Sequence, residues 1–315
     1  MTKWKQPPHR LFAALALILF TLAACRSSHE NERQEYKMPS LSPVSLDAGE
    51  KLDVVASTSI IADVLKNIGG DRLKLETLLP LGADPHAFEP TPQDVVAVSD
   101  AHVIFANGLG LEEFLDPLLE SAGATDKAVH VSHGIELDPR DADPHTWTDP
   151  NHVIVWTRTI ESALSALDPA NAETYAANAE TYRAALTELD AWVREQVAQV
   201  PKAKRQIVTD HLLFAHFADR YGFTQVGAIV PGYSTMSEPS AKELAELQDA
   251  IRDLGVQAIF VGTTVNPDLA QRVAQDTGVQ LIFLYTGSLT QKGGPADNYL
   301  DYVRYNVNAI VNALK

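Results

Sequence analysis

Hydrophobic residues come in short runs along residues 51–315, and amphipathic stretches separate these runs. Two series of four runs are present, at residues 52–58, 73–79, 102–108 and 128–132, and at residues 205–210, 225–230, 258–263 and 281–286. Runs of this length are typical of buried strands, whereas the periodic stretches between them, such as 60–70 and 239–255, are typical of helices. Alternating strands and helices predict parallel sheets covered by helices on both faces. We therefore expect an α/β fold of two lobes with mainly parallel sheets.

One long amphipathic segment, residues 167–201, separates the two series. Its hydrophobic residues recur every three or four positions and form one stripe: Tyr175, Ala179, Tyr182, Leu186, Leu189, Val193, Val197 and Val200. Asp168 suits the N-cap, Pro169 suits the first helical position, and Pro201 marks the stop. The pattern predicts a single helix of about 31 residues, roughly 46 Å long, that joins the two lobes. A pair of helices broken near Glu188 is the alternative.

The first residues have the pattern of an export signal. Basic residues in 1–10 precede a hydrophobic stretch at 11–24 that is too short to span a bilayer. The stretch ends in Leu-Ala-Ala-Cys, which resembles the lipobox of bacterial lipoproteins, so Cys25 is expected to carry the lipid. An ordinary signal peptide followed by a spare thiol is the alternative. Residues 26–50 are polar and rich in Ser and Pro, which is typical of a flexible tether.

These patterns predict the organisation of the whole chain. The predicted parts are a signal peptide at 1–24, a lipidated Cys25 with its tether at 25–50, an N-terminal lobe at 51–166, the linking helix at 167–201 and a C-terminal lobe at 202–315. Cys25 is the only cysteine, so an internal disulfide is excluded. The 25 Lys and Arg against 41 Asp and Glu give a net charge of −16, which argues against nucleic acid or anionic lipid as a partner.

Candidate chemistry lies among ten histidines. The phrase Ala-Asp-Pro-His occurs twice, ending at His86 and His145, and an aromatic residue follows two positions later each time. His211 directly follows the run at 205–210, so all three histidines lie in or at the end of loops that follow strands. Ligands bind beyond the carboxyl ends of strands in open α/β sheets, so such loops can meet in one cleft. Proline before histidine suits the rigid presentation of a metal ligand, although Asp-Pro-His is also a common turn composition.

Other polar residues are expected to have structural roles. His102 and His130 border or occupy predicted strands, where a buried and hydrogen-bonded imidazole is the ordinary case. His216 is five positions from His211, which on a helix places it on another face, so it is not expected to be a ligand. Four aspartates accompany the histidines and could cap turns and helices, the default, or orient imidazole rings: Asp84, Asp143, Asp149 and Asp210.

Several segments together carry a family resemblance. GADPHAFEPTPQDVVAVSDAHVIFANGLGLE, DPHTWTDPNHV and TDHLLFAHFADRYG resemble the three ligand loops of the metal-specific solute-binding proteins of bacterial ABC importers, the zinc and manganese receptors called cluster A-I or family 9. SEPSAKELAEL and NYLDYVRYN also fit this family, so the resemblance spans essentially the whole chain after the tether.

The resemblance implies a bilobed receptor that binds its metal between the lobes through His86, His145 and His211. It also implies an ABC transporter permease as partner, and a monomer that is exported and lipid-anchored on the outer face of the cell membrane or in the periplasm. In this family the third ligand is typically Glu in manganese receptors and His in zinc receptors. Because the residue here is His211, and because imidazole suits Zn²⁺ better than Mn²⁺, we expect Zn²⁺ as the cargo.

Two positions depart from the family pattern. Relatives commonly place an acidic ligand where this chain has Gly287, so the fourth ligand is open, and water is favoured over Glu89, Asp210 or Ser288. Many zinc receptors also carry a loop rich in histidine before the second ligand, where this chain has only His133, an expected exposed residue.

Three alternatives to a zinc receptor remain. A manganese or iron receptor of the same family is one, and an adhesin or structural lipoprotein is another. The third is a zinc hydrolase, because an open fourth position is also typical of catalytic zinc. The sequence has no His-Glu-x-x-His motif and no phosphate-binding glycine loop, so we expect a binding protein and not an enzyme.

Overall fold

The structure is a computed structural model that describes residues 38–47, 49–137 and 143–315. The predicted signal peptide at 1–24, the predicted lipidation site Cys25 and residues 26–37 of the predicted tether lie outside the described residues. The elements before the long helix are β1 (Leu52–Ala56), α1 (Ser59–Gly69), β2 (Leu73–Thr77), α2 (Pro92–Asp100), β3 (Val103–Ala106), α3 (Leu115–Ala122), β4 (Ala128–His130) and α4 (Pro150–Leu167). The following elements are α5 (Ala172–Val197), β5 (Gln206–Thr209), α6 (Ala215–Tyr221), β6 (Thr224–Ala228), α7 (Ala241–Leu254), β7 (Ala258–Gly262), α8 (Asp268–Thr277), β8 (Gln280–Leu284) and α9 (Tyr299–Leu314).

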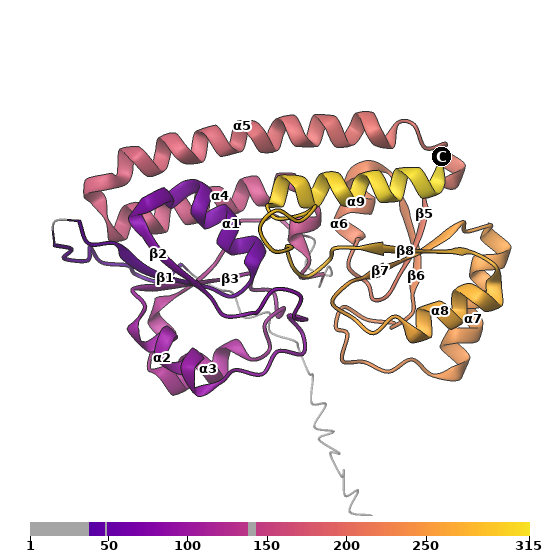
Figure 1. Cartoon of the computed structure of the whole chain (residues 1–315), viewed down its shortest axis with the longest axis horizontal. Coiled ribbons are helices and arrows are strands. Elements are labelled where there is room, and N and C mark those ends of the chain that lie inside the picture. The colour runs from indigo at the N-terminus through magenta and orange to yellow at the C-terminus, as the bar shows by residue number, and fades with distance from the viewer. Residues whose placement is uncertain (1–37, 48, 138–142) are drawn as a thin grey trace, which may run out of the picture. The chain divides into compact units, whose positions relative to one another are not determined.

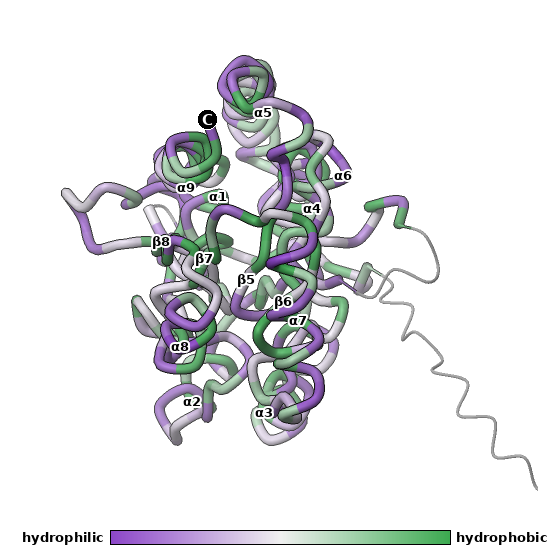
Figure 2. Tube along the Cα trace, turned by 90° about the vertical axis from the view of Figure 1, so that its right-hand side faces the viewer, coloured by the Kyte–Doolittle hydropathy of each residue, from purple (hydrophilic) through white to green (hydrophobic). Residues whose placement is uncertain are grey.

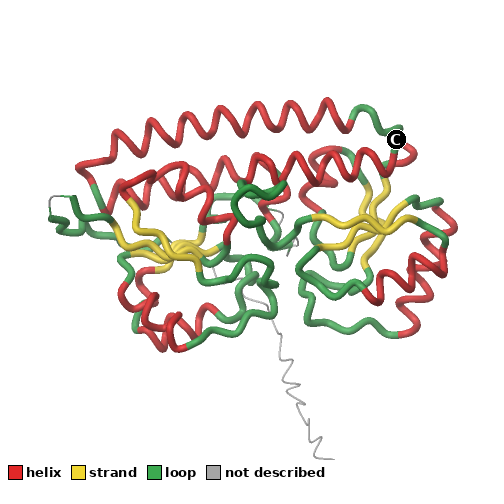
Figure 3. The backbone as a smooth tube through the Cα atoms, in the orientation of Figure 1, coloured by secondary structure: helices red, strands yellow, loops and turns green. Residues whose placement is uncertain are grey.

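Two parallel four-stranded sheets form the centres of the two lobes, with helices around them (Figure 3). The strand orders are β2-β1-β3-β4 and β6-β5-β7-β8, so both lobes have the same topology. Each of the eight hydrophobic runs singled out in the sequence contains one of these strands or overlaps it in all but its first residue. The predicted α/β fold of two lobes is confirmed.

The central strands are hydrophobic on both faces because helices cover both faces of each sheet. All residues of β3 and of β7 are buried, and the tube of Figure 2 is largely hydrophobic in colour at β7. Helix α7 has one buried face, and its turns alternate between hydrophilic and hydrophobic colours in Figure 2. It begins with a capping box between Ser240 and Glu243 and ends at Gly255, whose φ of 66° is the left-handed conformation that glycine adopts readily. The predicted helix end at Gly255 is confirmed.

The long helix α5 lies along α4 and α9 (Figure 1). All eight residues of the predicted hydrophobic stripe are buried. The helix is continuous through Glu188, so the alternative of a broken pair is wrong. It is shorter than predicted because residues Pro169–Asn171 form a 3-10 turn and the α-helix ends at Val197. Its 26 residues correspond to about 39 Å.

The two ends of the folded part also pack against the lobes. Met38, Leu41, Val44 and Leu46 are partly buried against the main hydrophobic core, and the Val44 amide donates to Leu167 O at 2.8 Å. Residues 38–47 therefore differ from the flexible tether that their Ser- and Pro-rich composition predicts. At the other end, the Tyr299 amide at the start of α9 donates to Asp63 Oδ2 of α1, so the last helix contacts the first lobe. The domain boundaries given above stay predictions.

No helix in the described ranges is both long enough and hydrophobic enough to span a bilayer.

Candidate metal centre

Three loops that follow strands bring His86, His145 and His211 together. His86 lies in the loop after β2, His145 follows β4, and His211 follows β5. The Nε2 atom of His145 lies 3.1 Å from Nε2 of His86 and 3.2 Å from Nε2 of His211. One ligand atom from each ring lies within 4.8 Å of the other two, and all three residues are buried. Of the ten histidines, the sequence singled out the three that the fold brings to one point.

Two carboxylates determine which ring nitrogen of His145 and of His211 can bind a metal. Asp143 Oδ1 lies 2.6 Å from Nδ1 of His145, and Asp210 Oδ1 lies 2.6 Å from Nδ1 of His211. Because an ionised carboxylate only accepts hydrogen bonds, both Nδ1 atoms donate, and a neutral ring then carries a lone pair on Nε2. The Nε2 atoms of His145 and His211 therefore face each other as two acceptors. Two acceptors cannot hydrogen bond to each other, and a shared cation is the partner that suits both.

The spacing of the nitrogens fits such a cation. Zinc binds imidazole nitrogen at about 2.0–2.1 Å, so two ligands at tetrahedral corners lie about 3.3 Å apart. The observed separations of 3.1 Å and 3.2 Å are close to this value. Two of the three pairs of nitrogens therefore already have the separation that ligands of one divalent ion require.

The ring of His86 is buried next to the other two imidazoles. Burial lowers the pKa of His86 to about 3, with further lowering by the charges that His145 and His211 would carry. Burial also lowers the pKa of His145, although Asp143 opposes this effect. Both rings are thus neutral near pH 7, which is the state that binds metal.

The carboxylate of Asp84 has a different role from that of Asp143. Asp84 Oδ1 accepts the backbone amide of His86 at 3.0 Å, whereas Oδ2 accepts the Thr235 hydroxyl at 2.6 Å. Thr235 belongs to the second lobe, in the loop between β6 and α7. Asp84 therefore links its ligand loop to the opposite lobe.

The default expectation that the aspartates cap turns and helices is incomplete for Asp143 and Asp210, because each accepts the backbone amide of its histidine and also orients the histidine ring. It is correct for Asp149, which accepts the Asn151 amide at the start of α4 and also pairs with Arg220 at 2.8 Å. The second oxygen of Asp210 accepts the Gly262 amide, so this carboxylate is already bonded at both oxygens. Glu89 is exposed.

The position of Gly287 leaves no room for a side chain. A Cβ atom built on Gly287 would lie 2.9 Å from Cδ of Pro85 and 3.6 Å from the hydroxyl of Thr264. The neighbouring Ser288 donates to Leu289 O at 2.9 Å, and the Gly82 amide donates to its hydroxyl, also at 2.9 Å. A side chain at position 287 would therefore require one of the two loops to shift.

The pocket at the three rings also contains residues that sequence reasoning did not select: Trp147, Leu213, Thr264 and Thr286. The ring of Trp147 lies edge-on to His145 with centroids 5.2 Å apart, and its Nε1 donates to Thr286 O at 2.9 Å. The Thr286 hydroxyl is buried and has no hydrogen-bond partner in the part of the chain that the structure describes. The repeated aromatic residue two positions after each Asp-Pro-His was the only sequence signal for any of these residues.

The other histidines in the described ranges are not among the three converging rings. His216 is on α6, and its Nε2 lies 3.0 Å from the backbone oxygen of Asp143. It is not among the three converging rings, as predicted, but the reason differs, because His211 lies in the loop before the helix and not on it. His102 accepts the Asp53 amide at its Nδ1 and is half-buried, and His133 is exposed.

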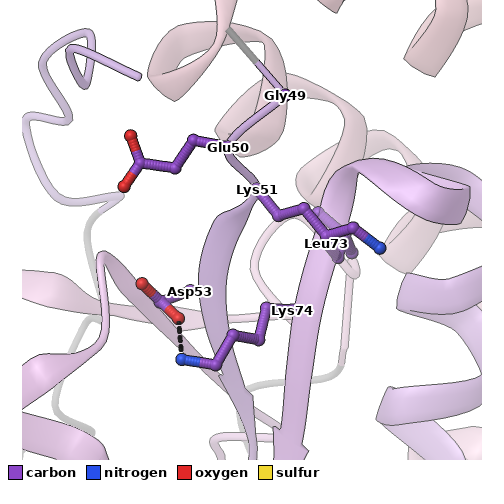
Figure 4. Close-up of a pocket in the computed structure, with 6 residues that line it drawn as sticks. All are labelled: Gly49, Glu50, Lys51, Asp53, Leu73 and Lys74. Atoms are coloured by element: carbon purple, nitrogen blue, oxygen red, sulfur yellow. Dashed lines mark hydrogen bonds and ion pairs between the residues drawn. The ribbon is translucent and has the colours of Figure 1, made fainter. Parts of the chain in front are cut away.

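A second pocket lies elsewhere on the first lobe, beside the start of β1 and β2 (Figure 4). It is lined by Gly49, Glu50, Lys51, Asp53, Leu73 and Lys74. The Lys74 ammonium lies 2.6 Å from Asp53 Oδ1, as the dashed line in Figure 4 marks. Exposed pairs of this kind are common on protein surfaces and contribute little.

Comparison with known proteins gives one matching family and close relatives. The model of the family described as zinc-uptake complex component A, periplasmic, matches residues 54–313. The manganese-binding lipoprotein MntA of Halalkalibacterium halodurans is 38% identical over 271 residues, which are 84% of this chain and 89% of MntA. The manganese ABC transporter substrate-binding lipoprotein PsaA of Streptococcus mitis is 33% identical over 281 residues, which are 85% of this chain and 90% of PsaA.

Among solved structures, the periplasmic zinc-binding protein TroA of Treponema pallidum has a similar fold. Its TM-score is 0.77 at 28% identity, with 84% of this chain and 99% of TroA covered. The match supports the two-lobed architecture with a long connecting helix. The names of the relatives cover both zinc and manganese.

Proposed function

The chain belongs to the family of zinc-uptake complex component A, the periplasmic metal-binding lipoproteins of ABC importers, and from this premise we propose that it is a receptor for Zn²⁺. Membership confirms the family resemblance found in the sequence and an extracytoplasmic location. It also implies an ABC permease as partner. In the proposal, His86, His145 and His211 bind the ion between the lobes, and the loaded receptor delivers it to that permease.

The observation that carries this proposal is the meeting of three Nε2 atoms, two of which belong to rings whose hydrogen positions are constrained by carboxylates. Asp143 and Asp210 place the protons of two rings on Nδ1 and leave the lone pairs on Nε2 pointing at a common centre. These two carboxylates also balance the charge of a divalent cation held by three neutral rings. Carboxylate–histidine–zinc arrangements of this kind orient the ligand and raise its basicity.

The donor set supports zinc over manganese. Imidazole nitrogen suits Zn²⁺, whereas Mn²⁺ prefers carboxylate and water oxygens. Manganese is the second candidate because MntA and PsaA are named for it. Against this candidate, Gly287 has no side chain that could supply a carboxylate, and both oxygens of Asp210 are already bonded.

The fourth ligand of our proposal is a solvent molecule. The contact between Gly287 and Pro85 excludes a side chain from that position, and the Thr264 hydroxyl lies beside it. The buried hydroxyl of Thr286 belongs to the same pocket and would gain a partner if solvent were present. One neutral oxygen ligand would complete a tetrahedral site.

The same carboxylates argue for a receptor over a zinc hydrolase. A hydrolase needs a general base near the metal-bound solvent. Asp143 and Asp210 hold ligand rings, and Asp84 accepts both the His86 amide and the Thr235 hydroxyl. Each nearby carboxylate therefore has a structural task that conflicts with proton transfer.

The proposed mechanism follows from the placement of the ligands on two lobes. His86 and His145 of the first lobe capture the ion, and His211 of the second lobe completes the site. Ligation across the cleft favours one arrangement of the lobes, which the permease distinguishes through its contacts. We further propose that a lipid on Cys25 anchors a monomeric receptor to the membrane and that nucleic acid is not a partner.

Metal competition tests this function. The protein, purified without chelators and then stripped, is titrated with Zn²⁺ and Mn²⁺ in competition with a chromophoric chelator. We expect one Zn²⁺ per chain, tighter binding of Zn²⁺ than of Mn²⁺, and loss of binding in His211→Ala. The matched control His133→Ala removes an exposed histidine and should bind as the unmodified protein does. Preference for Mn²⁺, or equal binding by His211→Ala, would contradict the proposal.

A further inference from the structure

His216 reaches from the second lobe to a ligand loop of the first lobe. It lies on α6, directly after the loop of His211, and only 6% of its surface is exposed. Its Nε2 is 3.0 Å from the backbone oxygen of Asp143. A carbonyl oxygen can only accept, so the Nε2–H of His216 donates this hydrogen bond.

The carbonyl that His216 holds is next to the most constrained ligand. Asp143 Oδ1 accepts both the backbone amide of His145 at 2.9 Å and its ring Nδ1 at 2.6 Å. Proline at 144 fixes its own φ, and the following carbonyl, Pro144 O, accepts the Asn107 amide side chain at 2.8 Å. The Asp143 carbonyl directly precedes this proline, and the hydrogen bond from His216 holds its direction.

We propose that His216 is a positioning residue for metal binding that acts through Asp143 on the ring of His145. This inference rests on the proposed function, because it presumes that His145 is a ligand. If Asp143 turns, its carboxylate can no longer hold Nδ1 of His145 and accept the His145 amide together. The ring then loses the orientation that directs its Nε2 to the centre of the site. His216 thereby makes the geometry of a first-lobe ligand depend on the second lobe.

A neighbouring histidine offers a matched control. The ring of His152 packs edge-on against His216 with centroids 4.8 Å apart, and His152 lies 4.0 Å from Asp149. Among the described residues, no hydrogen bond or ion pair joins His152 to Asp143. A change at His152 therefore disturbs the same cluster without removing the hydrogen bond to Asp143.

The experiment compares His216→Gln, His216→Met and His152→Met in the full chain. Glutamine and methionine have similar length, but only the glutamine amide can donate to the Asp143 carbonyl. The measurements are the Zn²⁺ dissociation constant by chelator competition, the visible spectrum of bound Co²⁺, and the melting temperature of the metal-free protein. If His216→Met does not fold, His216→Phe, which keeps a ring against His152, replaces it.

We expect His216→Met to bind Zn²⁺ roughly 10-fold more weakly and to have an altered Co²⁺ spectrum, because loss of a residue that supports a metal ligand typically has an effect of this size. His216→Gln should recover most of the affinity and the spectrum, and His152→Met should match the unmodified protein. A purely structural role of His216 would lower the melting temperature of both His216 variants and leave the Co²⁺ spectrum unchanged, which would overturn the inference. Zinc binding by His145→Ala at full affinity would instead overturn the proposed function.

Discussion

The two Asp-Pro-His segments share a sequence but differ in how the fold holds them. In both, the aspartate accepts the backbone amide of the histidine two positions later. Asp143 is completely buried and also holds the ring of His145, whereas the second oxygen of Asp84 bonds to Thr235 of the other lobe. The repeated motif therefore makes the same aspartate-to-amide hydrogen bond twice, and tertiary contacts decide that one copy fixes a ring while the other links the lobes.

The largest expected loss of Zn²⁺ affinity follows from removing one of the two histidine ligands in these segments. His145→Ala should weaken Zn²⁺ binding by more than roughly 100-fold, which is the upper limit typical of residues that only hydrogen bond to a metal ligand. His86→Ala should also weaken it strongly but less, because the His145–His211 pair with both orienting carboxylates remains. Isothermal titration calorimetry of both variants measures the ratio of their Zn²⁺ dissociation constants. A greater loss of Zn²⁺ affinity in His86→Ala than in His145→Ala would contradict the greater importance of the His145 segment.

The two aspartates should differ more clearly than the two histidines. Asp143→Asn removes the charge that faces Nδ1 of His145, so we expect roughly 10- to 100-fold weaker Zn²⁺ binding. Asp84→Asn keeps an oxygen for the His86 amide and should weaken binding only a few-fold. Chelator competition on the two variants checks this, and equal losses would show that the segments are equivalent.

Acid should destabilise the metal-free protein through His86. The pKa of His86 is about 3 in the folded chain, below the ordinary 6.5, because burial and the neighbouring imidazoles disfavour its charge. The unfolded chain therefore binds this proton at higher pH, and the free energy of unfolding falls as pH drops from 6.5 towards 3. The contribution is at most about 5 kcal/mol.

His86→Gln removes this contribution, so its free energy of unfolding should fall less between pH 7 and pH 4. Urea unfolding of both proteins at the two pH values, without metal, measures the difference. Parallel pH dependence in the two proteins would mean that His86 is not held neutral by its surroundings.

The smallest expected effect belongs to the link between the lobes. Thr235→Val removes the hydroxyl that bonds to Asp84 and keeps the shape of the side chain. We expect a two- to threefold faster release of Zn²⁺, since one hydrogen bond to a carboxylate is lost while all ligands remain. Stopped-flow release into a chelator measures the rate. The matched change Thr187→Val on α5, whose hydroxyl donates to Arg183 O within the helix, leaves this link and the metal pocket intact. A rate as fast as that of Thr235→Val would argue against a specific role of the link.

Sequence reasoning was most successful where one local pattern decides the outcome. The hydrophobic runs predicted all eight strands, and the stripe from Tyr175 to Val200 predicted the buried face of α5. The loops of His86, His145 and His211 could be chosen because parallel strands place their following loops on one side of the sheet.

What the sequence could not provide are contacts between distant segments. The Asp84–Thr235 bond spans 151 positions and the His216–Asp143 bond spans 73. No local periodicity encodes such pairs, because they depend on how the two lobes pack against each other. The same limit explains why the contact of His216 with Asp143 and the contact of Gly287 with Pro85 could not be predicted.

X-ray absorption at the zinc edge of the protein loaded with one equivalent of Zn²⁺ tests the central claim most directly. Three imidazole nitrogens and one further oxygen at about 2.0 Å are the expected surroundings of the ion. A site with fewer than three imidazoles, or with a sulfur ligand, would contradict the account.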